Sequence, residues 1–228
     1  MSDTLPQGEE KARAVQSMFD AIAPRYDLVN RIMTFGLDVR WRRRAVRELR
    51  LPKASTVLDL ACGTGDMCRD LDEAGLRPIG VDFSWGMLDH ARTGAPLVQA
   101  DAQRLPLPEA SVDGAISGFA LRNFSDLGTF FDELARVVRP AGRISLLDVA
   151  EPRYSVLRWG HSIYFGRVVP RIGGLLSDPA AYRYLPKSVA YLPEPDAMLE
   201  RLRTAGFRGV ERTLLSTGIT QLITATRA

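Results

Sequence analysis

Two carboxylates and a glycine turn are the residues of this chain whose types and spacing could do chemistry. Asp59 lies in the apolar run 56–60, which leads into a Gly-x-Gly turn and then into the start of a helix. This order is typical of a strand that delivers a nucleotide-like ligand to a helix N-terminus. Asp82 ends the next apolar run, where a carboxylate can accept hydrogen bonds from both hydroxyls of a ribose. The pattern therefore predicts an adenosine-containing cofactor.

The residues missing from this turn decide between cofactors. A dinucleotide site has a third glycine, where this chain has Cys68, and no Lys-Ser/Thr follows the loop as a P-loop requires. Asp59 precedes the turn, where its charge would repel a pyrophosphate and attract a ligand with an ammonium and a sulfonium. S-adenosylmethionine carries both charges, and we predict it as the cofactor. A turn without any ligand is disfavoured because Asp59 and Asp82 are both in register.

The composition is that of an ordinary globular protein. The 228 residues are 46% hydrophobic and 25% charged, and the net charge is +3. Acidic residues are interspersed among the arginines, which argues against a nucleic-acid partner. With two cysteines and two histidines, we expect neither a disulfide framework nor a metal site. We see neither a signal peptide nor an apolar stretch long enough to span a bilayer, so we expect a cytoplasmic protein.

One predicted helix carries a dense basic cluster around Trp41. Its ordinary interpretation is a solvated helix face, which we favour. The alternative is a patch that meets an anionic membrane surface. The arginines of the cluster are Arg40, Arg42, Arg43, Arg44 and Arg47.

The elements that must position the carboxylates alternate along the chain. This alternation predicts an α/β fold in which a mostly parallel, seven-stranded sheet carries helices on both faces. The predicted strands lie near 55–60, 77–82, 96–100, 112–118, 143–149, 208–215 and 219–226. The predicted helices lie near 9–27, 38–49, 66–74, 85–93, 126–139 and 194–205.

We expect one domain over residues 1–228, built from four parts. A helical cap at 1–50, with a disordered tail at 1–8, precedes the cofactor-binding core at 51–150. An aromatic- and arginine-rich insertion at 151–193 interrupts the alternation, and we expect a lid or substrate wall there. A closing helix and a strand hairpin at 194–228 complete the sheet.

Several blocks of the chain resemble the ubiquinone/menaquinone biosynthesis C-methyltransferases. The blocks at 18–30, 119–123 (Phe-Ala-Leu-Arg-Asn) and 181–188 are specific to that family, whereas the glycine loop and the block at 134–143 are generic to class I methyltransferases. The blocks at 35–43 and 170–174 match as well. The resemblance covers most of the chain from about 15 to 190. It implies a class I, Rossmann-like methyltransferase fold with S-adenosylmethionine as the cofactor.

The resemblance also assigns roles around the cofactor. It places the glycine turn at the methionine end and Asp82 at the ribose, and it places two residues after the third strand at the adenine. A glycine after the fourth strand would let the backbone approach the ligand closely. The residues in these roles, besides Asp59 and Asp82, are Gly63, Thr64, Gly65, Asp101, Ala102 and Gly118.

The reaction implied by the resemblance is methyl transfer to a ring carbon of a reduced prenylated quinone, from demethylmenaquinol to menaquinol or on a close ubiquinone-pathway quinol. Such a carbon is nucleophilic only when a ring hydroxyl, with a pKa of about 10, is ionised or polarised. Arg122 is the expected stabiliser of the phenolate, Tyr26 would order a water or position the ring, and Asp148 would accept a proton. A structural salt bridge for Arg122 and helix packing for Tyr26 are the alternatives.

Other interpretations stay open at this point. The chain departs from the family pattern at Ala120, at 147–149 and in the tail 216–222, which keeps a natural-product phenol or another small aromatic as an alternative acceptor. A nicotinamide oxidoreductase is disfavoured by the missing glycine, and a non-catalytic scaffold by the intact cofactor residues. Peripheral contact with the inner membrane face and a homodimer are partners that the sequence leaves open.

Overall fold

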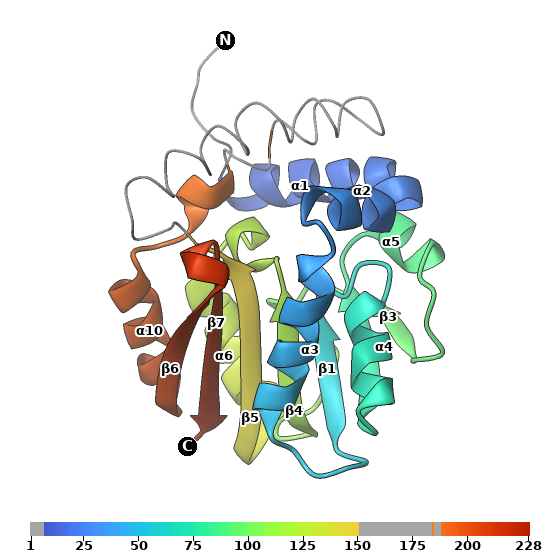
Figure 1. The fold of residues 1–228 in the computed structure, drawn as a ribbon. Coiled ribbons are helices and arrows are strands. Elements are labelled where there is room, and N and C mark those ends of the chain that lie inside the picture. Colours follow the sequence, from blue (N-terminus) through green and yellow to red (C-terminus); the bar gives the residue numbers. More distant parts are fainter. Residues whose placement is uncertain (1–6, 151–183, 185–187) are drawn as a thin grey trace.

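The computed structural model describes residues 7–150, 184 and 188–228 (Figure 1). Most of the predicted insertion at 151–193 lies outside the described residues, as do residues 1–6 of the predicted tail. The described strands form one seven-stranded sheet in the order β3-β2-β1-β4-β5-β7-β6. They are β1 (Thr56–Leu60), β2 (Arg77–Asp82), β3 (Leu97–Gln99), β4 (Val112–Gly118), β5 (Val138–Val149), β6 (Phe207–Leu215) and β7 (Thr220–Arg227).

The pairing confirms the predicted α/β fold with a mostly parallel sheet. Strands β1 to β5 pair in parallel, and β7 inserts antiparallel between β5 and β6. The chain moves outward from β1 to β3 and then returns to β4 on the other side of β1. In open α/β sheets, ligands bind at such a switch point, beyond the carboxyl ends of the strands.

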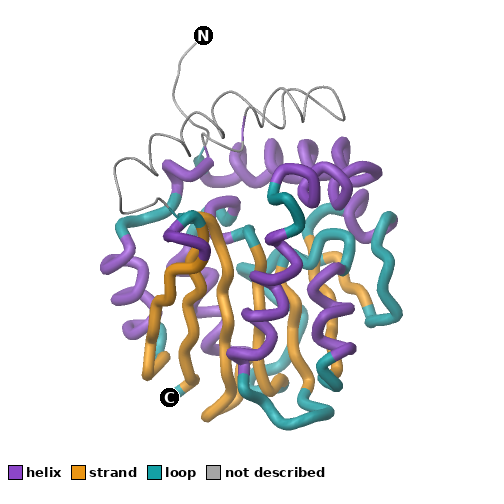
Figure 2. Tube along the Cα trace, viewed as in Figure 1, coloured by secondary structure: helices purple, strands orange, loops and turns teal. Residues whose placement is uncertain are grey.

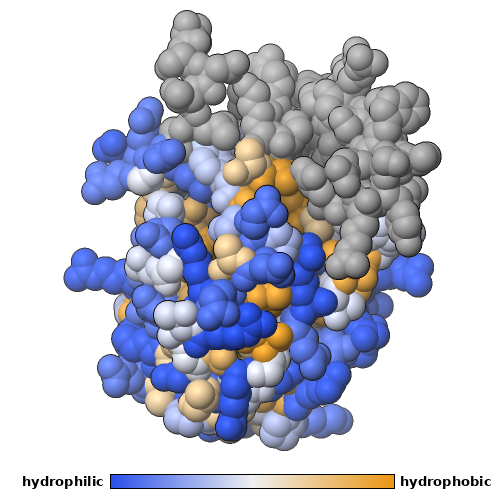
Figure 3. All heavy atoms as spheres, turned by 90° about the vertical axis from the view of Figure 1, so that its left-hand side faces the viewer, coloured by the Kyte–Doolittle hydropathy of each residue, from blue (hydrophilic) through white to orange (hydrophobic). Residues whose placement is uncertain are grey.

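Helices cover both faces of the sheet (Figure 2). On one face, α3 (Leu37–Leu49) and α4 (Asp66–Glu73) bury a cluster that includes Leu49 and Leu71. On the other face, α6 (Leu127–Val137) and α10 (Pro195–Thr204) bury the larger cluster around Phe130. Helices therefore shield both faces of the central strands, and β1 and β4 are buried along nearly their whole length instead of alternating between buried and exposed residues. The surface over α10 and β6 is mostly hydrophilic (Figure 3).

The N-terminal helices lie across the edge of the sheet where the parallel strands end (Figure 1). We predicted one helix over 9–27, but the structure has α1 (Gly8–Ile22), a 3-10 turn η1 (Ala23–Arg25) and α2 (Tyr26–Met33). The prediction was wrong because Pro24 lacks an N–H and its ring clashes with the preceding turn, so the helix breaks there. The break makes Tyr26 the first residue of a separate helix.

Two predicted helices end earlier in the structure, and short 3-10 turns lie between the other elements. The helix predicted at 85–93 ends earlier, as α5 (Trp85–Asp89), and the one predicted at 126–139 ends at Val137, where β5 begins at once. Three 3-10 turns complete the described chain: η2 (Leu121–Asn123), η4 (Val189–Tyr191) and η5 (Ser216–Gly218).

Candidate active site

A cavity opens between the ends of β1, β2 and β4 and the underside of α1. Its walls combine apolar and aromatic side chains with a few polar groups, as in sites that bind small molecules. Helix α1 contributes Ala12, Val15, Gln16 and Phe19 to its walls. The other walls that matter here are Tyr26, Gly63, Asp82, Phe83, Asp101, Ala102, Gly118, Phe119, Asn123 and Phe124.

The cavity brings together part of the predicted site. Six predicted residues line it: Tyr26, Gly63, Asp82, Asp101, Ala102 and Gly118. The other five predicted residues do not line it: Asp59, Thr64, Gly65, Arg122 and Asp148. Phe119 and Asn123 also face the cavity; they belong to the block 119–123 that carries the family resemblance, which had given them no role. Phe83 faces the cavity as well, although no residue pattern had singled it out.

Asp82 is clamped between two loops at the end of β2. Its Oδ2 accepts the N–H of Gly63 at 2.7 Å and its Oδ1 accepts the N–H of Ser84 at 2.8 Å. The side chain is buried, and burial raises its pKa against the opposing effect of these N–H donors. Each carboxylate oxygen has a second lone pair, and the residue lines the cavity. The carboxylate is therefore placed to accept further hydrogen bonds from a ligand, as the ribose assignment requires.

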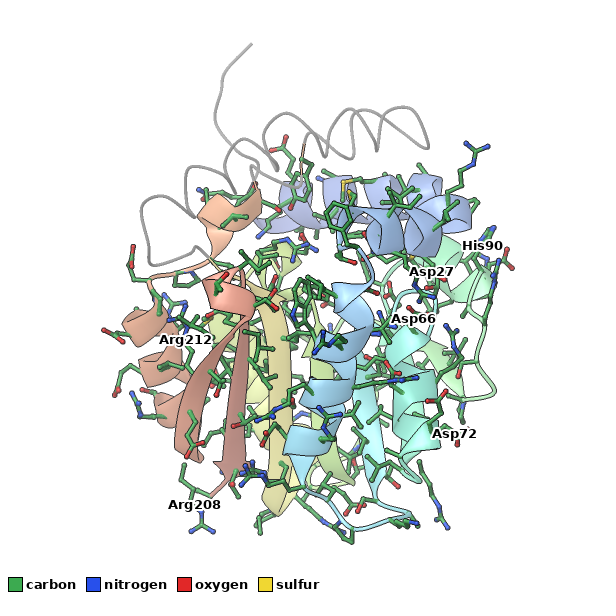
Figure 4. All side chains as sticks on the ribbon, in the orientation of Figure 1. Asp27, Asp66, Asp72, His90, Arg208 and Arg212 are labelled. Atoms are coloured by element: carbon green, nitrogen blue, oxygen red, sulfur yellow. The ribbon has the colours of Figure 1, made fainter. Side chains whose placement is uncertain are left out.

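The glycine turn is shaped by its backbone and anchored by its neighbours. Gly65 has a φ of +81°, and a Cβ there would lie 2.7 Å from Thr93 Cγ2. Only glycine fits this conformation without strain. The hydroxyl of Thr64 donates to Asp27 of α2, and Asp66 begins α4 directly after the turn; both carboxylates are marked in Figure 4. Thr64 therefore ties the turn to the cap instead of facing the cavity.

Gly118 at the end of β4 lies against Met67. A Cβ there would come within 2.8 Å of Met67 Cε, which is the tip of a flexible side chain and could move aside. On the other side of the cavity, Asp101 Oδ1 accepts the N–H of Gln103 at 2.9 Å. This bond orients the carboxyl group of Asp101 at the end of β3, where the adenine is predicted.

Asp59 is a buried carboxylate whose hydrogen bonding is incomplete. The side chain is fully buried, Cys68 Sγ donates to its Oδ2 at 3.2 Å, and its Oδ1 has no partner. Burial raises its pKa from 3.8 to about 7. An unsatisfied buried acceptor favours a positively charged ligand nearby, so the residue fits a cofactor that carries an ammonium and a sulfonium.

The titration of Asp59 gives a stability prediction. Between its unfolded pKa of about 3.9 and its folded pKa of about 7, the folded protein holds a proton that the unfolded chain has lost. The contribution of Asp59 to the free energy of unfolding therefore falls as the pH rises through this window, and above it the buried charge is fully unfavourable. Asp59→Asn should raise the Tm of the ligand-free protein at pH 8 and flatten the decline of Tm from pH 5 to pH 8. A variant with the slope of the wild-type protein would contradict this assignment.

Arg122 and Asp148 form a buried ion pair with each other. Arg122 Nη1 contacts Asp148 Oδ1, the Arg122 N–H donates to Asp148 Oδ2 at 3.2 Å, and the Val149 N–H donates to Oδ1 at 2.7 Å. Arg122 also donates to the Phe119 carbonyl at 2.6 Å and to Ser188 Oγ at 3.2 Å. This geometry supports the salt bridge that was the alternative for Arg122. It also leaves Asp148 poorly placed as a proton acceptor.

Tyr26 is the predicted catalytic residue that reaches the cavity. Its ring packs edge-on against Phe19, with centroids 5.9 Å apart. Burial raises its pKa, while a hydrogen bond with Asn30 and the charge of Arg122 act in the opposite direction. The phenol therefore stays protonated at neutral pH and can donate a hydrogen bond. Across the cavity, Asn123 Oδ1 accepts from the Tyr184 hydroxyl at 3.3 Å.

The basic cluster on α3 is less exposed than the favoured interpretation of a solvated face required. Arg42 is buried, and its guanidinium binds Asp38 at 2.6 Å, Asp66 at 2.9 Å and Asp70 at 3.0 Å. Its three partners are carboxylates of α3 and α4, so its positive charge is neutralised within the fold. Arg43 and Arg44 are exposed, and they pair with Glu73 and with the partly buried Glu48. The cluster joins two helices, and only its outer arginines face solvent.

Two negative findings concern the described residues alone. Within them, no three or more His, Cys, Asp or Glu side chains gather as metal ligands would. A search of the same residues finds no helix with the length and apolar character needed to cross a bilayer.

Comparisons with known proteins match nearly the whole chain. The model of the ubiE/COQ5 methyltransferase family matches residues 7–227. The chain is 41% identical to the ubiquinone/menaquinone biosynthesis C-methyltransferase UbiE of Syntrophotalea carbinolica, over 92% of this chain and 93% of that protein. It is 42% identical to the demethylmenaquinone methyltransferase of Deinococcus radiodurans, over 90% of each chain.

A solved structure supports the fold independently of close sequence similarity. An S-adenosylmethionine-dependent methyltransferase from Thermotoga maritima superposes with a TM-score of 0.61 at 18% identity. The match covers 94% of this chain and 100% of that one. The arrangement of strands and helices therefore agrees with class I methyltransferases.

Proposed function

Since this chain belongs to the ubiE/COQ5 methyltransferase family and is an S-adenosylmethionine-dependent methyltransferase, we propose that it methylates a ring carbon of a reduced prenylated quinone. The relatives named for demethylmenaquinone and for ubiquinone/menaquinone biosynthesis support this acceptor class. The single structural observation that carries the proposal is the cavity at the switch point, in which Asp82 and Asp101 share a space with aromatic walls.

The cofactor would be held by the strand ends. Asp82 accepts the ribose hydroxyls, Asp101 accepts from the adenine amine beside Ala102, and Asp59 faces the positive methionine end behind the glycine turn. Bound S-adenosylmethionine supplies an electrophilic methyl group on its sulfonium. The protein's part is to align this group with the acceptor carbon and to exclude water, which accounts for much of the acceleration in such reactions.

The acceptor would lie against the aromatic wall of the cavity. Phe19, Phe83, Phe119 and Phe124 line it, and apolar walls with a few placed polar groups suit an aromatic ring. Tyr26 and Asn123 are the polar groups on this side, and Tyr26 can donate to the ring hydroxyl as negative charge develops on it. We propose that Arg122 acts mainly by fixing the 119–123 turn, because Asp148 neutralises much of its charge.

An acceptor panel tests the proposed substrate class. Reduced demethylmenaquinone should accept a methyl group faster than the matched 1,4-dihydroxynaphthalene without the prenyl chain and faster than simple phenols, because the apolar walls bind the tail. Equal or faster methylation of an unprenylated phenol would support the natural-product alternative instead.

A prenylated acceptor resides in a membrane, and α2 offers a surface that could contact one. Leu28 and Ile32 are 57% and 40% exposed, and Phe35 in the following turn is 80% exposed with a φ of 51°. A bulky residue in the left-handed region costs about 1 kcal/mol or more, and exposing the ring adds to this cost. Arg25, Arg31 and Arg40 are exposed around this stripe. Apolar residues at helical spacing with flanking arginines are typical of helices that lie on anionic lipid.

We therefore place the proposed membrane contact on α2 rather than on the basic cluster of α3. Ile32→Ser combined with Phe35→Ser should reduce co-sedimentation with anionic phospholipid vesicles by about tenfold, since it removes the buried apolar area. Arg43→Ser with Arg44→Ser is the matched control and should bind the vesicles nearly as the wild-type protein does. Loss of binding in the control alone would restore the basic face as the contact.

A further inference from the structure

Asp20 lies in the last turn of α1 and accepts hydrogen bonds from the loop that follows Asp82, the proposed ribose-binding carboxylate. Its Oδ1 accepts the hydroxyl of Ser84 at 2.5 Å and the N–H of Gly86 at 2.9 Å. Asp20 does not line the cavity, and the residue patterns and the proposed chemistry give it no role. It is separated by more than 60 residues from the loop it holds.

Ser84 connects Asp20 to Asp82. The Ser84 N–H donates to Asp82 Oδ1 at 2.8 Å, and Ser84 Oγ accepts the N–H of Met87 at 3.1 Å as the N-cap of α5. A hydroxyl has one hydrogen, and an ionised carboxylate can only accept. Asp20 therefore fixes the direction of the Ser84 hydrogen and leaves its lone pair for the helix cap. The position of the Ser84 backbone, and with it one of the two N–H groups on Asp82, depends on this bond.

The two helices also touch through their backbones at the same point. A Cβ on Gly86 would lie 2.8 Å from Asp20 Cα and 3.0 Å from the Asp20 carbonyl oxygen. These atoms are backbone and cannot rotate away. Only glycine allows a contact this close. Gly86 of α5 and Asp20 of α1 therefore together set how α1 packs on α5.

A second bond from α1 reaches the residue between Asp82 and Ser84. Gln16 Nε2 donates to the Phe83 carbonyl at 2.9 Å. Gln16 itself lines the cavity together with Ala12, Val15 and Phe19 of the same helix. Helix α1, which covers the cavity, is thus hydrogen-bonded to the loop that follows Asp82, the carboxylate proposed to bind the ribose.

The negative charge of Asp20 lies near the buried carboxylate of Asp82, and this proximity is electrostatically unfavourable. Burial is the largest cause of the raised pKa of Asp82, and the charge of Asp20 raises it further. A second carboxylate near a buried one is unfavourable unless its hydrogen bonds compensate. For Asp20, the compensating hydrogen bonds are those that it accepts from Ser84 and Gly86.

We propose that Asp20 is a positioning residue for the cofactor: through Ser84 it sets the Asp82 carboxylate, and through Gly86 it seats α1 over the cavity. The proposal rests on the proposed placement of the ribose at Asp82. It predicts an effect on cofactor affinity and little effect on the chemical step once the cofactor is bound.

The test compares variants on both sides of the contact. Asp20→Ala should raise the Kd of S-adenosylhomocysteine, measured by calorimetry, about tenfold, because two hydrogen bonds to a charged acceptor are lost. Asp20→Asn keeps an oxygen acceptor and should stay within about threefold of the wild-type protein. Gly86→Ala should weaken binding as Asp20→Ala does, since it displaces the same contact. The exposed Asp72→Ala on α4 is the control and should bind normally.

Two further readouts separate positioning from general stability. The kcat at saturating S-adenosylmethionine should change less than about twofold in Asp20→Ala, while KM for the cofactor rises with Kd. In an Asp82→Ala background, Asp20→Ala should cause clearly less than the tenfold loss of affinity that it causes alone, because the route through Ser84 to Asp82 is already lost and only the seating of α1 through Gly86 is left.

Each outcome decides between the claims. An unchanged Kd in Asp20→Ala, or additive losses in the double variant, would overturn the positioning role. Equal losses in Asp20→Ala and Asp20→Asn would show that the charge rather than the bond matters, which also contradicts it. If Asp82→Ala alone leaves S-adenosylhomocysteine binding unchanged, then the ribose placement itself is wrong. None of these binding measurements depends on which acceptor is methylated.

Discussion

Replacing Asp82 by alanine should raise the Kd of S-adenosylhomocysteine, the demethylated cofactor, by about 100-fold. The carboxylate is held at the cavity wall by the N–H groups of Gly63 and Ser84, and it would accept both ribose hydroxyls. Hydrogen bonds to a charged group contribute about 1.5–3 kcal/mol each, and about 1.4 kcal/mol corresponds to a factor of ten in Kd. Isothermal titration of the ligand-free protein with S-adenosylhomocysteine measures the effect directly.

Asp82→Asn is the matched control, because it removes the charge and keeps an oxygen acceptor for the N–H groups of Gly63 and Ser84. Burial raises the pKa of Asp82, so its charge is costly to the ligand-free protein, and Asp82→Asn should have an unchanged or slightly higher Tm at pH 8 with an intermediate Kd. A variant that loses both stability and affinity would indicate unfolding of the loop, and a normal Kd would exclude Asp82 from the cofactor site.

Arg122→Ala should lower the free energy of unfolding by about 3–5 kcal/mol, because it leaves Asp148 buried without its cation. Asp148 is fully buried and Arg122 is 6% exposed, so water cannot replace the lost partner. Urea denaturation of the variant and the wild-type protein gives the difference. The substitution also removes the hydrogen bonds that Arg122 donates to the Phe119 carbonyl and to Ser188 Oγ, which adds to the loss.

A second variant separates the structural effect of Arg122 from its effect on the reaction. Arg122→Met with Asp148→Asn removes both charges and should recover most of the lost stability, as buried pairs often tolerate apolar replacement. If methyl transfer then stays at least about tenfold below the wild-type rate, the charge of Arg122 contributes to the reaction as well as to the fold. A stability loss below about 1 kcal/mol in Arg122→Ala would contradict the buried ion pair.

The parts of the site that sequence could predict are those within one strand–turn–helix unit. Asp59 and the glycine turn follow from local order along the chain, and Asp82 follows from the repeat of the same unit, because the carboxyl ends of parallel strands share one edge of the sheet. These predictions needed no knowledge of distant contacts. The alternation of strands and helices likewise fixed the parallel part of the sheet.

The parts that sequence could not predict depend on contacts between distant segments. Arg122 and Asp148 meet only because η2 folds back onto the end of β5, and a role for either depends on that pairing. Asp20 reaches Ser84 from a different layer of the molecule. Arg42 is charged in the sequence and gives no sign that three carboxylates surround it. The break at Pro24, by contrast, could have been predicted from the sequence, because proline rarely continues a helix.

Incubation of the enzyme with labelled S-adenosylmethionine and chemically reduced demethylmenaquinone, in a single turnover, tests the central claim most directly. Mass spectrometry with fragmentation then locates the methyl group. The account predicts a methyl group on the ring carbon of the quinol, and no product with the oxidised quinone. A methyl group on a hydroxyl oxygen, or no transfer by enzyme that binds the cofactor, would contradict the proposed function.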